Sequence, residues 1–245
     1  MTGSDATVVV HPDRQSLSDA AAARLVVAVL DAQAARGLAH VSMTGGSMGS
    51  QILTSLCADP ARHAVDWSRV HVWWGDERWL PAGDADRNDT QNDAAGLAGL
   101  GLDPDKVHRV LGPDASASAE ESASAYDDAL HEHADGPFDV MVLGVGPDGH
   151  VASLFPDHPV QAAEGSWAVA VHDSPKPPPT RVSMTRERLE RSREVWFLVS
   201  GADKADAVRR GVTGASYETT PAAHVHGAER TVWLVDADAA ADLRG

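Results

Sequence analysis

The chain has 245 residues, of which 43% are hydrophobic and 23% are charged, and its formal net charge is −16. This composition is ordinary for a globular protein with a sizeable core, and no apolar run approaches the roughly 18–20 residues that a membrane span requires. The acidic balance argues against nucleic acid as a partner. The one cysteine, Cys57, excludes an intrachain disulfide framework, and no signal peptide is visible, so the expected location is the cytoplasm.

The first elements alternate between strand and helix. Residues 7–11 are expected to form a strand, and a helix should follow, capped near residues 16–19 and ending at about Arg36, before Gly37. A second strand, residues 38–43, runs into Thr44-Gly45-Gly46-Ser47 and then a helix over 48–57. A strand, a Gly-Gly-Ser turn and a helix can present backbone N–H groups to a phosphate, although a tight turn without a ligand fits equally well.

A third buried strand, residues 70–74, ends in the charged segment Asp76-Glu77-Arg78. Such charges usually form a solvated loop. Here Trp73, Trp74 and Trp79 flank them in the sequence, which indicates a partly buried setting. Charges in such a setting must form ion pairs or take part in binding or catalysis. Beyond this segment we expect a helix over 88–100, a loop over 102–113 with a short strand at 107–111, and a surface helix over 116–133.

The most informative stretch is the strand at 140–143 and the loop that follows it. Gly144, Gly146 and Gly149 interrupt the chain there, and Asp148 and His150 lie among them. Glycines at this spacing allow positive φ angles and a close approach of the backbone to a ligand. A histidine on such a loop, beside a carboxylate, is a candidate general base. The alternative, a simple turn with a solvated histidine, is the weaker reading for a loop so rich in glycine.

The last part of the chain continues the alternation. A strand at 167–172 is followed by a proline-rich loop that carries Lys176 and Arg181, and this loop can be neither helix nor central strand. We then expect strands at 181–184, 194–200 and 231–235, and helices at 185–192, 202–212 and 236–243. Strands that are continuously apolar and alternate with helices predict an α/β fold, a mostly parallel sheet with helices on both faces, in one domain over residues 1–245.

Three of these loops together resemble the signature loops of the glucosamine-6-phosphate isomerase/6-phosphogluconolactonase family. They are Thr44 to Ser47, Gly75 to Arg78 with Pro81 and Asn88, and Gly144 to Pro156. The loop from Lys176 to Arg181, the segment Val195 to Gly201 with Lys204 and Ala205, and Pro221-Ala222 match as well, so the resemblance covers nearly the whole chain in order. It implies a Rossmann-like isomerase/deaminase fold.

Two positions distinguish this chain within that family. The deaminase branch has a glutamate five residues after the loop histidine, whereas this chain has Phe155 there, as lactonases do. The family usually reads Ser-Gly-Gly-Ser-Thr-Pro at the first loop, and here Met48 and Gly49 replace the last two residues. The resemblance therefore favours lactone hydrolysis, with a phosphate loop that lacks its usual proline and one hydroxyl.

The implied activity is hydrolysis of 6-phospho-D-glucono-1,5-lactone to 6-phospho-D-gluconate in the oxidative pentose phosphate pathway. His150 would act as general base on water and Arg78 would bind the oxyanion or the carbonyl, while Asp148 would either orient His150 or hold sugar hydroxyls, with Asp76 the weaker candidate for that work. The expected substrate-binding residues are Gly45, Gly46, Ser47, Asp76, Lys176 and Arg181. The phosphate would lie on the backbone of residues 45–47, with Lys176 and Arg181 closing over it. No cofactor or metal is required, because a δ-lactone is already reactive.

Three other functions are consistent with parts of the sequence. The first is an aminosugar-6-phosphate deaminase or isomerase, and the second is a non-catalytic protein that binds a sugar phosphate. The third is a metal hydrolase, suggested by the pairs His131-x-His133 and His224-x-His226. Neither pair has a matching third ligand nearby, so surface or packing roles are the expectation for them. The partner we expect is a small phosphorylated lactone, with the protein a monomer or a small homo-oligomer and not bound to a membrane.

Overall fold

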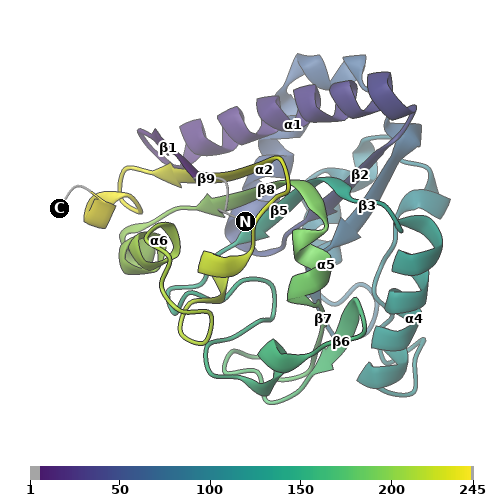
Figure 1. The fold of residues 1–245 in the computed structure, drawn as a ribbon. Coiled ribbons are helices and arrows are strands. Elements are labelled where there is room, and N and C mark those ends of the chain that lie inside the picture. Colours follow the sequence, from purple (N-terminus) through teal and green to yellow (C-terminus); the bar gives the residue numbers. More distant parts are fainter. Residues whose placement is uncertain (1–5, 244–245) are drawn as a thin grey trace.

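The computed structural model describes residues 6–243, and its centre is a six-stranded, fully parallel sheet (Figure 1). The sheet has the order β1-β9-β8-β5-β2-β3. Its strands are β1 (Thr7–His11), β2 (Ala39–Met43), β3 (Val70–Trp74), β5 (Phe138–Gly144), β8 (Ser192–Val199) and β9 (Arg230–Asp236). All six were predicted as strands, and all but β2 are rich in β-branched or aromatic residues.

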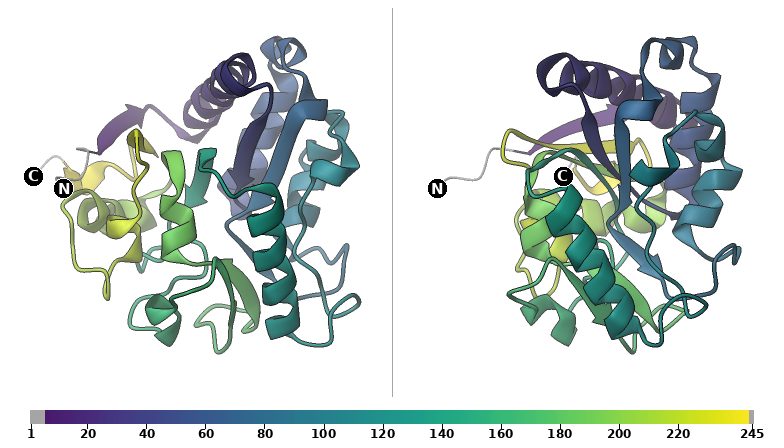
Figure 2. Two further views of the ribbon diagram at one scale, coloured as in Figure 1. Left: turned by 45° about the vertical axis from the view of Figure 1, so that its right-hand side comes forward. Right: turned by 90° about the vertical axis from the view of Figure 1, so that its right-hand side faces the viewer.

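Helices cover both faces of this sheet, as predicted (Figures 1 and 2). Helices α1 (Arg14–Arg36) and α2 (Gly46–Ala58) share one core with Val140 and Val142 of β5. Helices α4 (Ala119–His133), α5 (Arg186–Glu190) and α6 (Ala205–Val212) pack on the other face, where Met141 and Leu143 point. The short helix α3 (Asn88–Ala94) lies against α2. Successive residues of β5 therefore pack into the cores on opposite faces of the sheet, which explains the continuous apolar sequence of this strand.

The ends of α1 follow the predicted signals with one shift. Asp13, rather than a residue of the 16–19 segment, is the N-cap, and its carboxylate accepts a hydrogen bond from the Ser16 amide at 2.7 Å. Gly37 ends the helix with φ of 81° and donates its N–H to the Gln33 carbonyl, as expected of a C-terminal glycine. Within residues 6–243, no helix is both long enough and apolar enough to cross a bilayer.

A second, smaller sheet departs from the predicted arrangement. The strands β4 (Asp76–Arg78), β6 (Ala168–Val171) and β7 (Arg181–Met184) form an antiparallel sheet of their own in the order β4-β7-β6. The segment 76–78 was predicted as a loop, and the other two as strands of one mostly parallel sheet. Every residue of β7 is buried, as in a central strand of a parallel sheet, although the strand pairs antiparallel on both sides. The sequence of a buried strand does not indicate which other strand it pairs with.

Three predicted elements are shorter or absent. Helix α3 ends at Ala94 because Gly96 takes φ of 124°, and residues Leu97–Gly99 form a separate 3₁₀ turn. The predicted strand at 107–111 is reduced to one bridge between Val107 and Val72. The predicted final helix at 236–243 is only a 3₁₀ turn, Ala241–Leu243, since β9 extends to Asp236 and its carboxylate accepts the Gly201 and Ala239 amides.

The strand order defines where a ligand should bind. From β2 the chain proceeds to β3 in one direction across the sheet, whereas from β5 it proceeds through β8 to β9 in the other. The order therefore reverses between the neighbours β2 and β5, and the loops that leave their carboxyl ends separate there. In open α/β sheets, the crevice at such a switch point is the usual ligand site. Those two loops are Thr44 to Ser47 and Gly144 to His150.

A stack of imidazoles lies near the opposite ends of these strands. His40 of β2 stacks on His71 of β3 with ring centroids 4.4 Å apart, and His71 lies 5.2 Å from His108. The indole of Trp73 covers His108 at 3.7 Å. Burial, which disfavours the charged imidazolium, lowers the pKa of His40 and His108 to about 3 and of His71 to about 4, and neighbouring imidazoles and cations add to this effect.

These histidines should make the protein less stable in mild acid. Below pH 6.5 the unfolded chain takes up protons on the three residues, whereas the folded chain does not take them up until about pH 4 to 3. The free energy of unfolding should therefore decrease as the pH is lowered through that window. Each wholly excluded proton is worth at most about 1.4 kcal/mol per pH unit, and less where solvent screens the ring. The measurement is urea unfolding at several pH values between 7.5 and 4.5.

A variant isolates this contribution from that of the carboxylates. His108→Gln removes one of the three titrating groups, so its free energy of unfolding should depend less steeply on pH below 6.5 than that of the parent. The charged neighbours Lys106, Asp103 and Arg188 remain in both proteins. Parallel pH curves for the two proteins would show that His108 does not contribute.

Candidate active site

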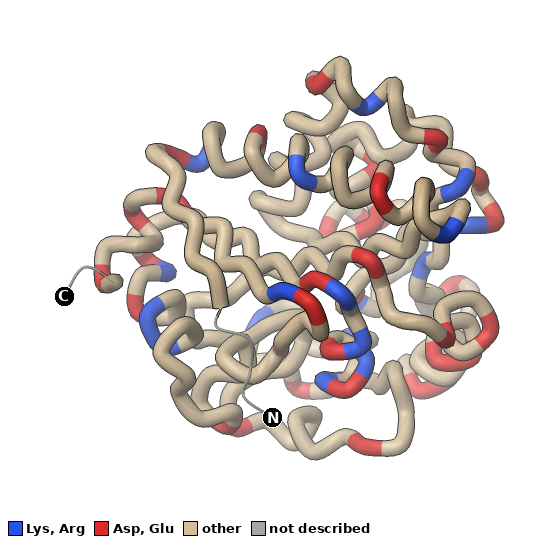
Figure 3. The backbone as a smooth tube through the Cα atoms, turned by 45° about the horizontal axis from the view of Figure 1, so that its top comes forward, with Lys and Arg blue, Asp and Glu red and all other residues tan. Residues whose placement is uncertain are grey.

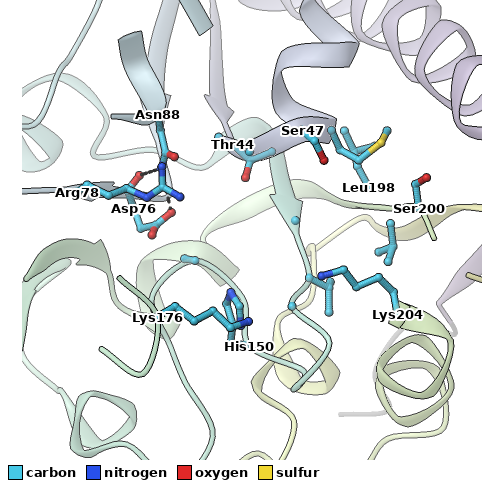
Figure 4. A pocket seen from close by; sticks show the side chains of 18 of the residues that line it. Thr44, Ser47, Asp76, Arg78, Asn88, His150, Lys176, Leu198, Ser200 and Lys204 are labelled. Atoms are coloured by element: carbon cyan, nitrogen blue, oxygen red, sulfur yellow. Dashed lines mark hydrogen bonds between the residues drawn. The ribbon is translucent and has the colours of Figure 1, made fainter. Parts of the chain in front are cut away.

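A polar pocket of about 270 Å³ opens at the carboxyl ends of β2, β3, β5 and β8, where the strand order predicts a ligand (Figure 4). Its walls come from loops that are far apart in the sequence. The lining residues that bear polar or charged side chains are Thr44, Ser47, Asp76, Arg78, Asn88, His150, Lys176, Arg181, Ser200 and Lys204. Glycines 45, 46, 144 and 146 supply backbone to the same walls.

The start of α2 forms one wall of the pocket. The N-cap of this helix, Gly45, has no side chain to accept the first-turn amides, and Ser47 is exposed in the pocket. A Cβ on Gly45 would lie 1.7 Å from Oδ1 of Asn88, so only glycine fits between the helix start and Asn88. Gly46 has φ of 71°, which also favours glycine. The Gly46 amide donates to Oε1 of Gln91 at 3.2 Å, so the helix dipole and the other first-turn N–H groups are what this wall can offer to an anion.

Gly49 explains how α2 starts without the family's usual proline. A Cβ at this position would lie 1.9 Å from the Thr44 carbonyl oxygen, so the glycine lets the first turn of the helix close onto the preceding loop. We expect Gly49→Ala to lower stability by about 1–3 kcal/mol, the usual cost of overpacking. Thermal melting measures this loss. Gly99→Ala is the matched control, because nothing lies within 4 Å of its added Cβ, and equal melting temperatures for both variants would contradict the prediction.

The glycine-rich loop after β5 holds His150 in a defined orientation. The Gly146 amide donates to the His150 carbonyl at 3.0 Å, and the Gly149 amide donates back to the Gly146 carbonyl at 2.9 Å. Gly149 takes φ of 92°, and a Cβ on Gly146 would lie 2.0 Å from the His150 ring. The turn therefore depends on glycine at both positions. It leaves the His150 side chain 17% exposed, in the pocket.

Asp148 lies behind His150 and does not line the pocket. Its Oδ1 is 2.6 Å from Nδ1 of His150 and 3.3 Å from Nζ of Lys176. Burial would raise the pKa of Asp148, but the hydrogen bond and charge of His150, together with Lys176, hold it well below the usual range. An ionised Asp148 accepts the Nδ1 proton, so we assign the tautomer in which Nε2 of His150 is free to accept a proton.

Asp76, Arg78 and Asn88 form the wall opposite α6. Asp76 is fixed on both oxygens, since Oδ2 accepts from the Ser153 hydroxyl at 2.6 Å and Oδ1 from Nδ2 of Asn88 at 3.4 Å. One nitrogen of Arg78, Nη1, donates to the Asp86 carbonyl at 2.5 Å. Nε of Arg78 is buried and has no hydrogen-bond partner among the described residues, so a ligand cannot reach it. Nη2 also makes no hydrogen bond within the described residues, and this is the nitrogen that remains for a ligand in the pocket.

The buried carboxylate of Glu77 connects these wall residues. It accepts the amides of Arg78 and Asn88 at 2.7 Å each and the Asp89 amide at 2.9 Å. Burial and the nearby charge of Asp89 raise the pKa of Glu77 to about 7, although Arg87 and the amides oppose this. Glu77 thus caps the start of α3 and sets the spacing between Arg78 and Asn88. The sequence placed this residue only in a charged loop.

The pocket is locally positive on an acidic protein. Its lining holds four cationic side chains, Arg78, Lys176, Arg181 and Lys204, against one carboxylate, Asp76, whereas the whole chain carries −16. Acidic residues are spread around the outside of the backbone, with a group of them on α4 (Figure 3). This distribution favours a small anion in the pocket and not elsewhere on the surface.

The structure brings together all the predicted site residues, and it adds others. Eight of the nine predicted residues line the pocket, and the ninth, Asp148, contacts His150. Lys204 was not predicted as a site residue, yet its side chain points into the pocket from the turn after β8 (Figure 4). Asn88 and Ser200 were missed as well. The signal for Lys204 was its position just beyond the carboxyl end of a buried strand.

The two His-x-His pairs have packing roles elsewhere. His131 stacks on Trp167 with ring centroids 3.7 Å apart, and Nε2 of His224 lies 2.7 Å from the Ala215 carbonyl. Among residues 6–243, no three His, Cys, Asp or Glu side chains gather in a group that could hold a metal ion. None of these four histidines lines the pocket.

The fold and the pocket define a class of protein: an α/β protein with a parallel sheet covered on both faces, and with a cation-lined pocket at the strand ends that holds a histidine paired with an aspartate. Residues 12–233 match the family model described as glucosamine-6-phosphate isomerases/6-phosphogluconolactonase. The chain therefore belongs to that family.

Individual relatives agree with this assignment. The chain is 47% identical to a 6-phosphogluconolactonase of Streptomyces coelicolor, over 96% of this chain and 94% of that protein. The crystal structure of 6-phosphogluconolactonase from Trypanosoma brucei superposes with a TM-score of 0.82 at 25% identity, covering 97% of this chain and 98% of that one. A monomeric glucosamine-6-phosphate deaminase has a TM-score of 0.81 at 19% identity, over 96% and 99%, so it shares the fold alone.

Proposed function

We propose that this protein hydrolyses 6-phospho-D-glucono-1,5-lactone to 6-phospho-D-gluconate, with His150 as the general base. The observation that carries the proposal is the 2.6 Å contact between His150 and Asp148 at the wall of a pocket lined by four cations. The relatives named 6-phosphogluconolactonase support the choice of substrate. In a cell, this reaction belongs to the oxidative pentose phosphate pathway.

The phosphate is best accommodated at the start of α2. Gly45 and Ser47 offer backbone N–H groups and a hydroxyl, and the ammonium group of Lys204 points into the same pocket (Figure 4). The Gly46 amide donates to Oε1 of Gln91 at 3.2 Å, an exposed contact that a phosphate oxygen can replace. Burial lowers the pKa of Lys204, whereas Asp203, 3.7 Å away, opposes that shift and favours the charged form. A helix N-terminus combined with a cation is a common phosphate site.

The lactone ring then extends toward His150 and Arg78. Nε2 of His150 removes a proton from a water as the water attacks the carbonyl carbon, and the resulting imidazolium is stabilised by Asp148. The carbonyl electrons move to the oxygen, where the free part of the Arg78 guanidinium stabilises the oxyanion. When the oxyanion collapses, the bond to the ring oxygen breaks and the imidazolium returns its proton to that oxygen. The products are one carboxylic acid and one hydroxyl group.

Phe155 disfavours a deaminase, and the His150–Asp148 pair disfavours a non-catalytic binding protein. Phe155 is fully buried, and its ring lies 4.8 Å from the His150 ring, at the position where a deaminase carries a glutamate. An apolar ring there cannot transfer the protons that ring opening and ammonia release require. A binding protein without turnover would have no use for a histidine held by an ionised aspartate.

The deciding experiment follows acid release from freshly prepared phosphorylated lactone against its spontaneous hydrolysis. We expect the protein to accelerate acid release strongly at neutral pH, and to release no ammonia from glucosamine 6-phosphate in a parallel assay. Ammonia release without lactone turnover would support the deaminase. Binding of 6-phosphogluconate without either reaction would support the non-catalytic alternative.

A further inference from the structure

Arg181 is the most buried cation of the pocket, and its hydrogen bonds point away from the ligand space. The residue is 5% exposed. Its Nη2 donates to the carbonyls of Lys176 at 3.0 Å and Pro177 at 3.1 Å, and its Nε donates to the Pro178 carbonyl at 3.2 Å. Three consecutive carbonyls of the proline-rich loop therefore converge on one guanidinium.

The remaining nitrogen of Arg181 is also engaged. Nη1 lies 3.6 Å from Oδ2 of Asp76, and the guanidinium lies over the Phe155 ring at 5.7 Å. Arginine has five N–H donors in a rigid planar arrangement. With Nε and Nη2 directed at the loop, only Nη1 remains for a phosphate, and it already forms an ion pair with Asp76, at a distance too long for a hydrogen bond. This geometry differs from that of Lys204, whose one carboxylate neighbour is at 3.7 Å.

The loop needs such a clamp because of its composition. Prolines 177–179 have no N–H groups, so the segment cannot form regular hydrogen-bonded structure, and its carbonyls need donors from elsewhere. Ser174 closes the loop from the other side, with its amide on the Pro179 carbonyl at 3.0 Å and its hydroxyl on the Lys176 carbonyl at 2.8 Å. Arg181 and Ser174 together fix the backbone of Lys176.

The fixed backbone places the Lys176 ammonium beside the proposed catalytic pair. Nζ of Lys176 lies 3.3 Å from Oδ1 of Asp148 and 3.1 Å from Nδ1 of His150. A cation at this position favours the ionised carboxylate, and the ionised carboxylate holds the His150 proton on Nδ1. A lysine side chain is long and flexible, so its backbone must be held if the ammonium is to stay there.

We propose that Arg181 is a positioning residue: it clamps the loop from Lys176 to Pro178 and so holds the Lys176 ammonium against the His150–Asp148 pair, instead of binding the substrate phosphate. This inference rests on the proposed function and deepens it. It replaces the role in phosphate binding that the sequence predicted for Arg181.

The test separates turnover from phosphate binding. We would measure kcat on the phosphorylated lactone, and the Kd of 6-phosphogluconate by calorimetry, for the wild type, Arg181→Met and Lys204→Met. Arg181→Met should lower kcat by about tenfold to a hundredfold, as expected when a catalytic group is displaced. It should leave Kd within about threefold. Lys204→Met, the matched control, should instead weaken Kd by about tenfold or more.

A double-mutant cycle tests whether Arg181 acts through Lys176. If it does, Arg181→Met combined with Lys176→Met should have the kcat of the slower single variant, within about threefold, because each change removes the same contact. Multiplied losses in the double variant would overturn the inference. So would a loss of 6-phosphogluconate affinity in Arg181→Met as large as that in Lys204→Met.

Two further measurements keep the test decisive. Circular dichroism melting of each variant reports folding, and Arg181→Lys serves if Arg181→Met does not fold. A lysine ammonium lacks the extended planar arrangement of donors that reaches three consecutive carbonyls, so Arg181→Lys should also lower kcat with little change in Kd. Full activity in Arg181→Lys would overturn the inference. A wild-type protein without lactone turnover overturns the proposed function, whatever the variants do.

Discussion

Replacing His150 with alanine should lower kcat on the phosphorylated lactone by about 10²–10⁴-fold, the range that positioned acid–base groups contribute. The reason is that one imidazole serves both proton transfers: it takes a proton from the attacking water and returns it to the ring oxygen. Its Nδ1 is held by Asp148 at 2.6 Å, so no reorientation is needed between the steps. The loss should appear in kcat, with a smaller change in KM, because the phosphate contacts remain.

The control for this variant is His172→Ala. His172 is a surface histidine that also contacts a carboxylate, with Nε2 at 2.6 Å from Oε1 of Glu120. It does not line the pocket, so its removal should leave kcat unchanged. Both variants should melt cooperatively. If His150→Ala folds and retains near wild-type turnover, another group must activate the water.

Replacing Arg78 with methionine should lower kcat by about 10²–10³-fold, comparable to the loss of an oxyanion donor in other enzymes. Arg78 projects from β4 into the pocket, and its Nη2 makes no hydrogen bond among the described residues. The charge that develops on the carbonyl oxygen in the transition state has few other donors on that wall. Methionine keeps most of the side-chain volume, so the packing around β4 should survive.

Arg209→Met is the matched control for the loss of an arginine. Arg209 is exposed on α6, where it pairs with Asp206 at 2.5 Å, and it does not line the pocket. The measurement is steady-state kinetics of both variants on the phosphorylated lactone. A rise in KM with unchanged kcat in Arg78→Met would assign Arg78 to uniform substrate binding and remove it from oxyanion stabilisation.

The sequence predicted the fold well where local patterns were decisive. All six strands of the parallel sheet and the helices on both of its faces were predicted, because continuous apolar runs and helical periodicity are visible within a few residues of each other. It missed β4, and it predicted β6 and β7 as strands but placed them in the main sheet instead of a separate antiparallel one. The pairing of β4 with β7 joins segments about 100 residues apart, as between Arg78 and Arg181, so no local pattern reports it.

For the site, the sequence predicted the loops that form it but not the direction of every side chain. Glycine-rich turns at strand ends pointed to the helix start at Gly45 and to the loop of His150, since the carboxyl ends of parallel strands meet at one edge of a sheet. The direction of a long side chain is not a local property. Lys204 was therefore missed, and the donors of Arg181, expected to face a phosphate, face the carbonyls of their own loop.

By itself, the sequence determined which segments become strands and helices and which loops carry reactive side chains, because backbone propensity, glycine and proline act over a few residues. Only the tertiary structure decided which side chains of those loops contact one another. It turned Arg181 toward residues 176–178, placed Lys176 beside His150 and Asp148, and inserted Asn88 against Gly45. These contacts join distant segments, so they depend on how the two sheets pack and not on any short stretch of residues.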